Sequence, residues 1–253
     1  MLKIKDLAKS FAGIKAVTDV SFDVNAGEIV SVIGPNGAGK TSVFNMITGF
    51  YTPDSGSILF KDKEVAGLPP HVIARLGSAR TFQNIELFQD MTVEENMRVA
   101  CQCHSPVTAM RAILRLPSVV RRESKETEAI KSMLELLGLS DKADYLASAL
   151  SYGEQRRLEI ARALATDATL LLLDEPTAGM MPTEVGVMME TIDRIRRRGI
   201  TVALIEHNMK MVMGISDRII VMDHGAKIAE GLPAEIRNNP RVLQAYLGEE
   251  SAA

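Results

Sequence analysis

The chain has 253 residues, 46% of them hydrophobic and 24% charged, so it is long enough to bury one large or two modest cores. Its formal net charge of −3 gives no electrostatic footprint for nucleic acid, and the arginines at 121–122 and 194–198 are typical of solvated helix faces. No apolar run approaches the roughly 18 to 20 residues that span a bilayer, and the first residues lack a signal-peptide core. We therefore expect a globular chain that binds no nucleic acid and meets a membrane only through a partner.

Two strand-like segments, at residues 17–24 and 57–60, lie on either side of a glycine-rich loop at residues 34–41. Residues 28–33 read as a buried strand and residues 41–47 as a helix, and the loop fits the pattern G-x-x-x-x-G-K-[ST]. In this pattern backbone N–H groups face nucleotide phosphates, a lysine covers their charge and a hydroxyl binds magnesium. A glycine-rich turn without a ligand is the minor alternative. We predict phosphate contacts from Gly34, Pro35, Asn36, Gly37, Ala38, Gly39, Lys40, Thr41 and Ser42, with Thr41 also on magnesium.

The middle of the chain has the pattern of a helical insert. Residues 92–100 and 126–137 show helical periodicity, and Gly138 suits the end of a helix. Pro106 and Pro117 break the stretch between them.

Two cysteines of this insert, Cys101 and Cys103, lie beside His104. Two thiols and one imidazole make only part of a tetrahedral metal site. Reduced thiols without a metal are therefore the favoured interpretation.

A serine precedes the next predicted helix, at residues 156–164. Ser151 and Glu154 form a capping-box pair, so the structural interpretation is a well-started helix. The functional interpretation is a second phosphate site, because an exposed helix N-terminus attracts anions. One chain with two phosphate sites suggests a composite arrangement.

An apolar run at residues 170–173 delivers two carboxylates at the end of a predicted central strand. Asp174 is placed to hold magnesium, and Glu175 to polarise the water that attacks a γ-phosphate. A strand followed by a solvated acidic turn is the alternative. Beyond it, residues 201–205 predict a strand, and residues 219–230 a hairpin around a turn at 223–225.

With these motifs in place, the chain resembles the ATP-binding-cassette (ABC) ATPases. Their signature L-S-G-G-Q is matched from residue 150 onward, except for Tyr152 at the first glycine position and Glu154 beside the glutamine. In that family two subunits sandwich ATP, each presenting its signature to the nucleotide on the other's phosphate loop. The resemblance implies ATP and Mg as cofactors, a second cassette subunit, and nucleotide contacts from Ser151, Gly153 and Glu154.

The resemblance also implies the fold, an α/β P-loop NTPase with a central, mostly parallel sheet, an antiparallel β portion and a helical subdomain. The single nucleotide-binding domain would span 1–253, with an ATP-binding core at 1–83 and 151–253 and the helical subdomain at 84–150.

Three further residues resemble functional positions of the family. Phe11 resembles the aromatic residue that stacks on adenine, although a residue of this kind beside a strand is at least as often part of a core. Gln83 resembles the glutamine that reaches magnesium and the attacking water, although a lone glutamine is usually a surface residue. His207 resembles the histidine that contacts the γ-phosphate, and a neutral imidazole can both donate and accept there. The resemblance thus implies three catalytic residues, Glu175, His207 and Gln83.

One position departs from the family pattern. After the strand at 170–173 the family commonly has an aspartate or asparagine before a helix, but this chain has Met181 followed by Pro182. With proline first in the helix, Met181 is the predicted cap and offers no acceptor, a loss of about 1 kcal/mol unless Thr183 starts the helix instead.

A finer resemblance, carried by residues 80–88, 213–219 and 239–248, is to the LivG-type ATPases of bacterial branched-chain amino acid importers. It implies import of hydrophobic amino acids through an integral membrane permease, with a solute-binding protein as an indirect partner. The chain would then be cytoplasmic and peripheral on the inner face of the membrane. The ATPase of lipopolysaccharide export has a similar C-terminus, and a soluble non-transport ABC ATPase or a GTP-binding switch are more distant alternatives.

The permease is expected to dock on the insert, where Phe88, Met91 and Val93 would supply apolar anchors for a short helix.

Overall fold

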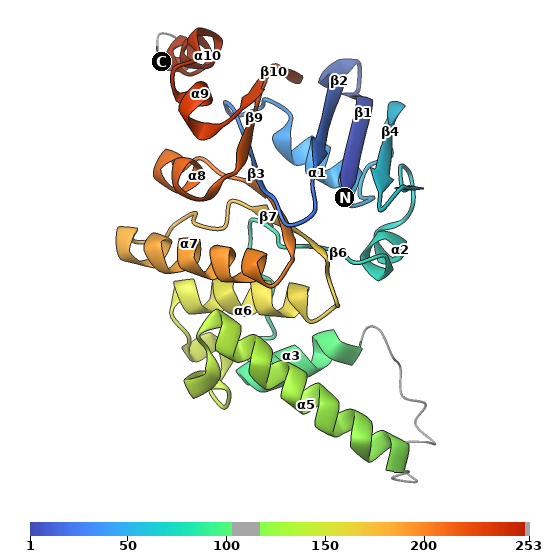
Figure 1. The fold of residues 1–253 in the computed structure, drawn as a ribbon, viewed down its shortest axis with the longest axis vertical. Coiled ribbons are helices and arrows are strands. Elements are labelled where there is room, and N and C mark those ends of the chain that lie inside the picture. The colour runs from blue at the N-terminus through green and yellow to red at the C-terminus, as the bar shows by residue number, and fades with distance from the viewer. Residues whose placement is uncertain (103–116, 251–253) are drawn as a thin grey trace.

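The structure, a computed structural model, describes the backbone of residues 1–102 and 117–250 and the side chains of residues 1–101 and 124–246. Two sheets form its centre (Figure 1). The smaller sheet is antiparallel, with the order β2-β1-β4-β5. Its strands are β1 (Leu2–Phe11), β2 (Ile14–Val24), β4 (Ser55–Phe60) and β5 (Lys63–Glu64).

The larger sheet has the order β10-β9-β3-β8-β7-β6 and is parallel except where β10 pairs with β9. This agrees with the predicted mostly parallel sheet and antiparallel β portion. Its strands are β3 (Ile29–Ile33), β6 (Ser78–Arg80), β7 (Leu170–Asp174), β8 (Thr201–Ile205), β9 (Arg218–Asp223) and β10 (Ala226–Gly231).

Helices cover both faces of the parallel sheet. They are α1 (Lys40–Ile47), α2 (Pro70–Arg75), α3 (Val93–Gln102), α5 (Pro117–Leu137), α6 (Tyr152–Leu164), α7 (Pro182–Arg197), α8 (Met209–Ile215), α9 (Pro233–Arg237) and α10 (Pro240–Glu250). In Figure 1, α3 and α5 lie beyond α6, on the side away from the antiparallel sheet.

Alternate side chains of β7 face two different cores, because successive residues of a strand point to opposite faces. Leu170 and Leu172 pack with α1 and the antiparallel sheet. Leu171 and Leu173 pack with α6, α7, α3 and α5. The unbroken apolar run at residues 170–173 is therefore the mark of a strand buried on both faces, as the sequence predicted.

The predicted strands and helices are confirmed, with one shift in the insert. Helix α5 begins at Pro117 rather than near residue 126, because proline is well accommodated in the first turn of a helix. Gly138 ends the helix as predicted, with a φ of 65°. The N–H of Leu139 donates to the carbonyl of Leu134 at 2.8 Å, the bond of a Schellman cap. Pro106 lies outside the described residues.

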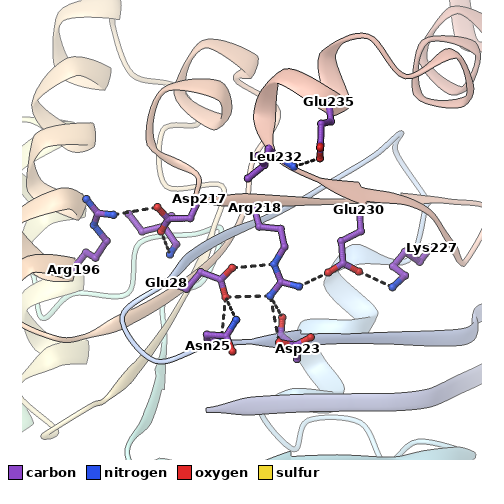
Figure 2. A network of polar contacts seen from close by, with 11 residues as sticks. Asp23, Asn25, Glu28, Arg196, Asp217, Arg218, Lys227, Glu230, Leu232 and Glu235 are labelled. Atoms are coloured by element: carbon purple, nitrogen blue, oxygen red, sulfur yellow. Dashed lines mark hydrogen bonds and ion pairs between the residues drawn. The ribbon is translucent and has the colours of Figure 1, made fainter.

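A polar network centred on Arg218 joins the two sheets (Figure 2). Its Nε on β9 donates to Glu28 Oε1 at 2.9 Å, and a terminal nitrogen donates to the carbonyl of Asp23, on β2, at 2.6 Å. The guanidinium also contacts Glu230 on β10. The hydrogen bond with Glu28 raises the pKa of Arg218, so the network stays charged at any physiological pH.

Candidate nucleotide site

The glycine-rich loop connects β3 to α1 and requires its glycines for close approach. A Cβ added to Gly34, whose φ is 147°, would lie 2.0 Å from the carbonyl oxygen of Met222. A Cβ added to Gly39, whose φ is 94°, would lie 2.4 Å from the carbonyl oxygen of Ala16. The backbones of β9 and β2, one from each sheet, therefore lie so close to the loop that only glycine fits at these two positions.

The N-terminus of α1 has no protein cap. Gly39 precedes the helix without a side-chain hydrogen bond to it, and its first turn contains no acidic residue. The ammonium of Lys40 donates to the carbonyls of Gly34 and Pro35, both at 2.7 Å. An anion bound here would find a helix N-terminus without a side-chain cap and a cation already in the loop. Of the other predicted loop residues, Asn36, Gly37 and Thr41 are exposed, Ser42 is half-buried and Ala38 is buried.

A carboxylate and a hydroxyl suited to magnesium are available here. Asp174 ends β7, and its side chain is 7% exposed. Its Oδ2 accepts a hydrogen bond from Arg80 at 2.8 Å, while Oδ1 has no donor among the described residues. The exposed residue Thr41 places its hydroxyl in the first turn of α1. Oxygen atoms of these two types are the ligands that magnesium prefers, so the residues fit the ion.

The three predicted catalytic residues converge on one carboxylate. Glu175 Oε2 accepts from the amide of Gln83 at 3.3 Å, and Glu175 Oε1 lies 3.1 Å from Nε2 of His207. Glu175 has a φ of 47°, and its N–H donates to the carbonyl of Ile205 at 2.9 Å. A positive φ outside glycine is strained, and such strain clusters at functional sites.

A second carboxyl group, Glu206, is buried beside this cluster and was missed as a site residue. It is 3% exposed and hydrogen-bonded to the hydroxyl of Thr177. Burial, helped by the nearby charge of Glu175, raises the pKa of Glu206 to about 7. Its position directly after the buried strand β8 and before His207 is the signal that could have identified it.

The signature residues Ser151 and Glu154, at the start of α6, form hydrogen bonds with each other. Ser151 Oγ accepts from the N–H of Glu154 at 3.4 Å, and Glu154 Oε2 accepts from the N–H of Ser151 at 2.9 Å. This confirms the predicted capping box. Glu154 also forms an ion pair with Lys142 at 2.8 Å. Burial alone would raise the pKa of Glu154, but its bonds to Lys142 and Ser151 lower it.

The structure does not bring this helix end to the phosphate loop. The hollow lined by Ser151, Gly153 and Glu154 is bounded by residues of α7 and the segment before it. Gly153 is buried, and a Cβ added to it would lie 2.9 Å from Glu184 Oε1. In one chain, therefore, the two predicted phosphate sites stay separate.

An arginine of α6, Arg156, was also missed. It is fully buried and donates to the carbonyls of Phe82 and Gln83 at 2.6 and 2.7 Å. It also forms an ion pair with Glu159 at 2.8 Å. Arg156 thus fixes the segment around Gln83 to α6. Arg156 lies four residues before the apolar Ile160, so both are on the same face of the helix. This spacing could have identified Arg156 as a buried residue.

The remaining predicted residues have individual environments. Phe11 is 39% exposed at the end of β1 and packs edge-to-face on Tyr51, with ring centroids 5.0 Å apart. Met181 precedes α7 as predicted, is 68% exposed, and makes no side-chain hydrogen bond to the helix. Cys101 is half-buried against the hydrophobic core. Cys103 and His104 lie outside the described residues.

None of the described helices is both long enough and apolar enough to span a bilayer.

Comparisons with known proteins place the chain in a family. A family model for "ABC transporter" matches residues 17–178, and one for "Branched-chain amino acid ATP-binding cassette transporter" matches residues 226–252. The chain is similar to the high-affinity branched-chain amino acid transport ATP-binding protein LivG of Escherichia coli, with 48% identity over 98% of each chain. It is also similar to the corresponding protein BraF of Pseudomonas aeruginosa, with 46% identity over 98% of each.

Among solved structures, the chain is similar to an ATP-binding cassette of an ABC transporter in its ADP conformation. The TM-score is 0.85 and the identity 32%, and 98% of each chain is covered.

Proposed function

Because the chain belongs to the ABC transporter family, as an ATP-hydrolysing cassette, we propose that it powers the import of branched-chain amino acids through a membrane permease. The observation that carries this proposal is the full-length similarity to LivG, joined by the match of residues 226–252 to a branched-chain amino acid cassette. The amino acid itself would bind to the permease and to a solute-binding protein, and not to this chain.

ATP would bind with its phosphates in the loop before α1. The uncapped N–H groups of α1 would face the phosphates, and Lys40 would exchange its two loop carbonyls for phosphate oxygens. Phe11, which is 39% exposed at the end of β1 in the antiparallel sheet, would stack on the adenine. Thr41 and Asp174 would hold Mg, with Gln83 reaching it, and the ion would offset the negative charge that develops on the phosphates.

Hydrolysis would use the cluster around Glu175. Its carboxylate would accept a proton from the attacking water, and Gln83 and His207 would orient that water and the γ-phosphate. His207 is 40% exposed and Glu175 only 23%, so the imidazole stands nearer to solvent than the base. Gln83 and His207 both contact the carboxylate of Glu175, and groups held together in this way are preorganised for catalysis.

A second cassette, of the same or a paralogous chain, would complete the site. Ser151, Gly153 and Glu154 would contact the nucleotide held by the other subunit's phosphate loop. The capping box would then have to exchange at least one of its own hydrogen bonds for a phosphate oxygen.

The permease would dock beside residues 84–150, which we propose as the helical subdomain, and hold the chain on the inner face of the membrane. Phe88 and Met91 are 43% and 38% exposed and can serve as anchors. The prediction for Val93 was wrong, since Val93 is 0% exposed and packs in the core on the inner face of α3.

Uptake of labelled leucine, in cells with and without this chain, tests the substrate. We expect uptake to fall when the chain is removed and to return with the wild-type chain. Unchanged uptake of leucine, isoleucine and valine would contradict the proposed substrate class.

Phe88→Glu tests the docking surface. We expect transport to fall while the basal ATPase activity of the isolated chain survives, because a charge would be buried in the interface. Leu232→Glu, at another exposed apolar position (57% exposed), is the control. Loss of both activities in Phe88→Glu would mean that the fold is damaged.

A further inference from the structure

Arg80, at the end of β6, connects three parts of the molecule. One terminal nitrogen donates to Asp174 Oδ2 at 2.8 Å. The other donates to Asn45 Oδ1 at 2.7 Å and to Thr48 Oγ1 at 3.1 Å, both in or just after α1. The guanidinium carbon lies 5.8 Å from the ring centre of Phe44 and 5.2 Å from that of Phe82. With two rings and three acceptors around it, this guanidinium has one available orientation.

The hold on Asp174 selects which carboxylate oxygen faces the nucleotide. Both side chains are buried, Arg80 at 5% and Asp174 at 7% exposed. Because Arg80 occupies Oδ2, the carboxylate is kept from rotating and Oδ1 remains open. A planar guanidinium is well suited to this, whereas an ammonium could not reach Asp174 and α1 at once.

Arg80 also lines a groove of about 340 Å³ between α2, β6 and α6. Its Nε is buried without a hydrogen-bond partner among the described residues. Phe82, which covers the guanidinium, is 39% exposed and packs edge-to-face on Phe50, which is 51% exposed, at 5.6 Å. Both rings line the groove, so an occupant that displaces Phe82 displaces the packing of Arg80.

We propose that Arg80 is a positioning residue for magnesium, which presents Asp174 Oδ1 to the ion and links that carboxylate to the wall of the groove. The proposal rests on the proposed role of Asp174 in the nucleotide site and does not depend on the transported solute. Partners that orient a metal-binding carboxylate typically contribute 10- to 100-fold to metal affinity.

The test titrates free Mg²⁺ and measures the affinity of the isolated full-length chain for a non-hydrolysable ATP analogue. For Arg80→Gln we expect the Mg²⁺ concentration that gives half of the gain in affinity to rise at least about tenfold. Affinity in the presence of a chelator should stay within about twofold of wild type, because the phosphate loop is untouched. Arg80→Lys, which keeps the charge, should give a smaller rise in this Mg²⁺ concentration. It replaces Arg80→Gln in the test if that variant does not fold.

Two further variants separate the alternatives. Phe82→Ala should raise the same Mg²⁺ concentration severalfold, because it removes one wall around the guanidinium. Arg162→Gln is the matched control, since Arg162 also stacks on a phenylalanine, Phe88, at 4.9 Å but does not contact Asp174. It should behave as wild type. Adding Mg²⁺ and the analogue should raise the melting temperature least in Arg80→Gln, more in Phe82→Ala, and as much as in wild type in Arg162→Gln.

Three outcomes would overturn the proposal. A normal Mg²⁺ dependence in Arg80→Gln removes the positioning role, and an equal loss of affinity with and without Mg²⁺ shows a merely structural one. A normal dependence in Phe82→Ala removes the link to the groove wall. A wild-type chain whose affinity ignores Mg²⁺ would overturn the role of Asp174 itself, and this proposal with it.

Discussion

The N-termini of α1 and α6 carry the two predicted phosphate sites, and they are built in opposite ways. Helix α1 begins at a glycine with no side-chain cap, no acidic residue in its first turn and a buried lysine. Helix α6 begins with a complete capping box, and the acidic residue of that box forms an ion pair with Lys142. The first end has no side-chain cap, and the second has a complete one.

Because of this difference, we expect the α1 end to bind ATP in the isolated chain and the α6 end to act when two subunits form a dimer. An uncapped helix end gains most of its missing hydrogen bonds from the ligand, so the isolated chain should bind ATP at α1. At a capped end, hydrogen bonds to a phosphate replace bonds of the capping box, so the net gain in binding free energy is small. We therefore expect the α6 end to contribute only when a second subunit holds the nucleotide in a fixed position. The two ends should therefore respond differently to substitution, charge and pH.

The sharpest test removes hydrolysis while leaving both helix ends intact. Glu175→Gln should keep ATP affinity within about twofold of wild type and lower turnover at least ~100-fold, because the amide keeps the shape but cannot accept the proton. The ATP-bound dimer should persist on size-exclusion chromatography. Glu190→Gln, an exposed carboxylate of α7, is the control. Near wild-type turnover in the purified variant would remove Glu175 as the base.

The second test compares two carboxyl groups, Glu206 beside the Glu175 cluster and Glu154 at the α6 end. The raised pKa of Glu206 means that its folded form is neutral where the unfolded chain is already ionised. Stability should therefore fall as pH rises from about 4.5 through about 7, by on the order of 2 kcal/mol relative to Glu206→Gln. Urea unfolding at pH 5 and pH 8.5 measures this change.

Glu154, at the α6 end, has a lowered pKa and should show the opposite sign. Its contribution is present above its unfolded pKa and is lost as pH falls, so Glu154→Gln should differ from wild type near neutral pH and converge with it in acid. Parallel slopes for the two variants would contradict the comparison.

The third test adds one methyl group to each end. Gly39→Ala should weaken ATP binding by the isolated chain about tenfold, because the methyl meets a backbone oxygen and a positive φ is costly for alanine. Gly153→Ala meets only the end of the Glu184 side chain, so ATP binding should be unchanged while the ATP-bound dimer weakens. Gly186→Ala, with open space around it, is the control. Equal losses of ATP affinity in both variants would contradict separate roles.

The smallest effect concerns a third helix end, that of α7. Met181 is exposed and provides no cap, so Met181→Asp should stabilise the chain by about 1 kcal/mol through a new N-cap. If an aspartate at this position also contacts the second subunit, the ATP-bound dimer of a Glu175→Gln background should strengthen. Melting curves and dimer sizes measure both effects. A lower melting temperature with a weaker dimer would show that methionine packs favourably in the interface.

The sequence predicted those parts of the site that depend on neighbours along the chain. The phosphate loop, the strand ending in Asp174 and the capping box of Ser151 each combine residues within a few positions, so their spacing reveals them. Arg80 and Arg156 could not be assigned in the same way, because their partners lie dozens of residues away. Val93 was assigned to a docking surface because periodicity alone does not say which face of α3 is covered.

The Arg218 network has a mechanical consequence. By bonding β9 to β2 and to the segment before β3, it ties the two sheets to each other. A change at the γ-phosphate can move another part of the chain only if the part that holds the nucleotide stays in place. The opposite edge of the parallel sheet has its own polar contacts, in which Arg80 holds Asp174 and Arg156 holds the carbonyl of Gln83. Because Arg156 joins α6 to the segment around Gln83, we expect changes at the nucleotide site to be passed on through α6 and the helices that pack on it.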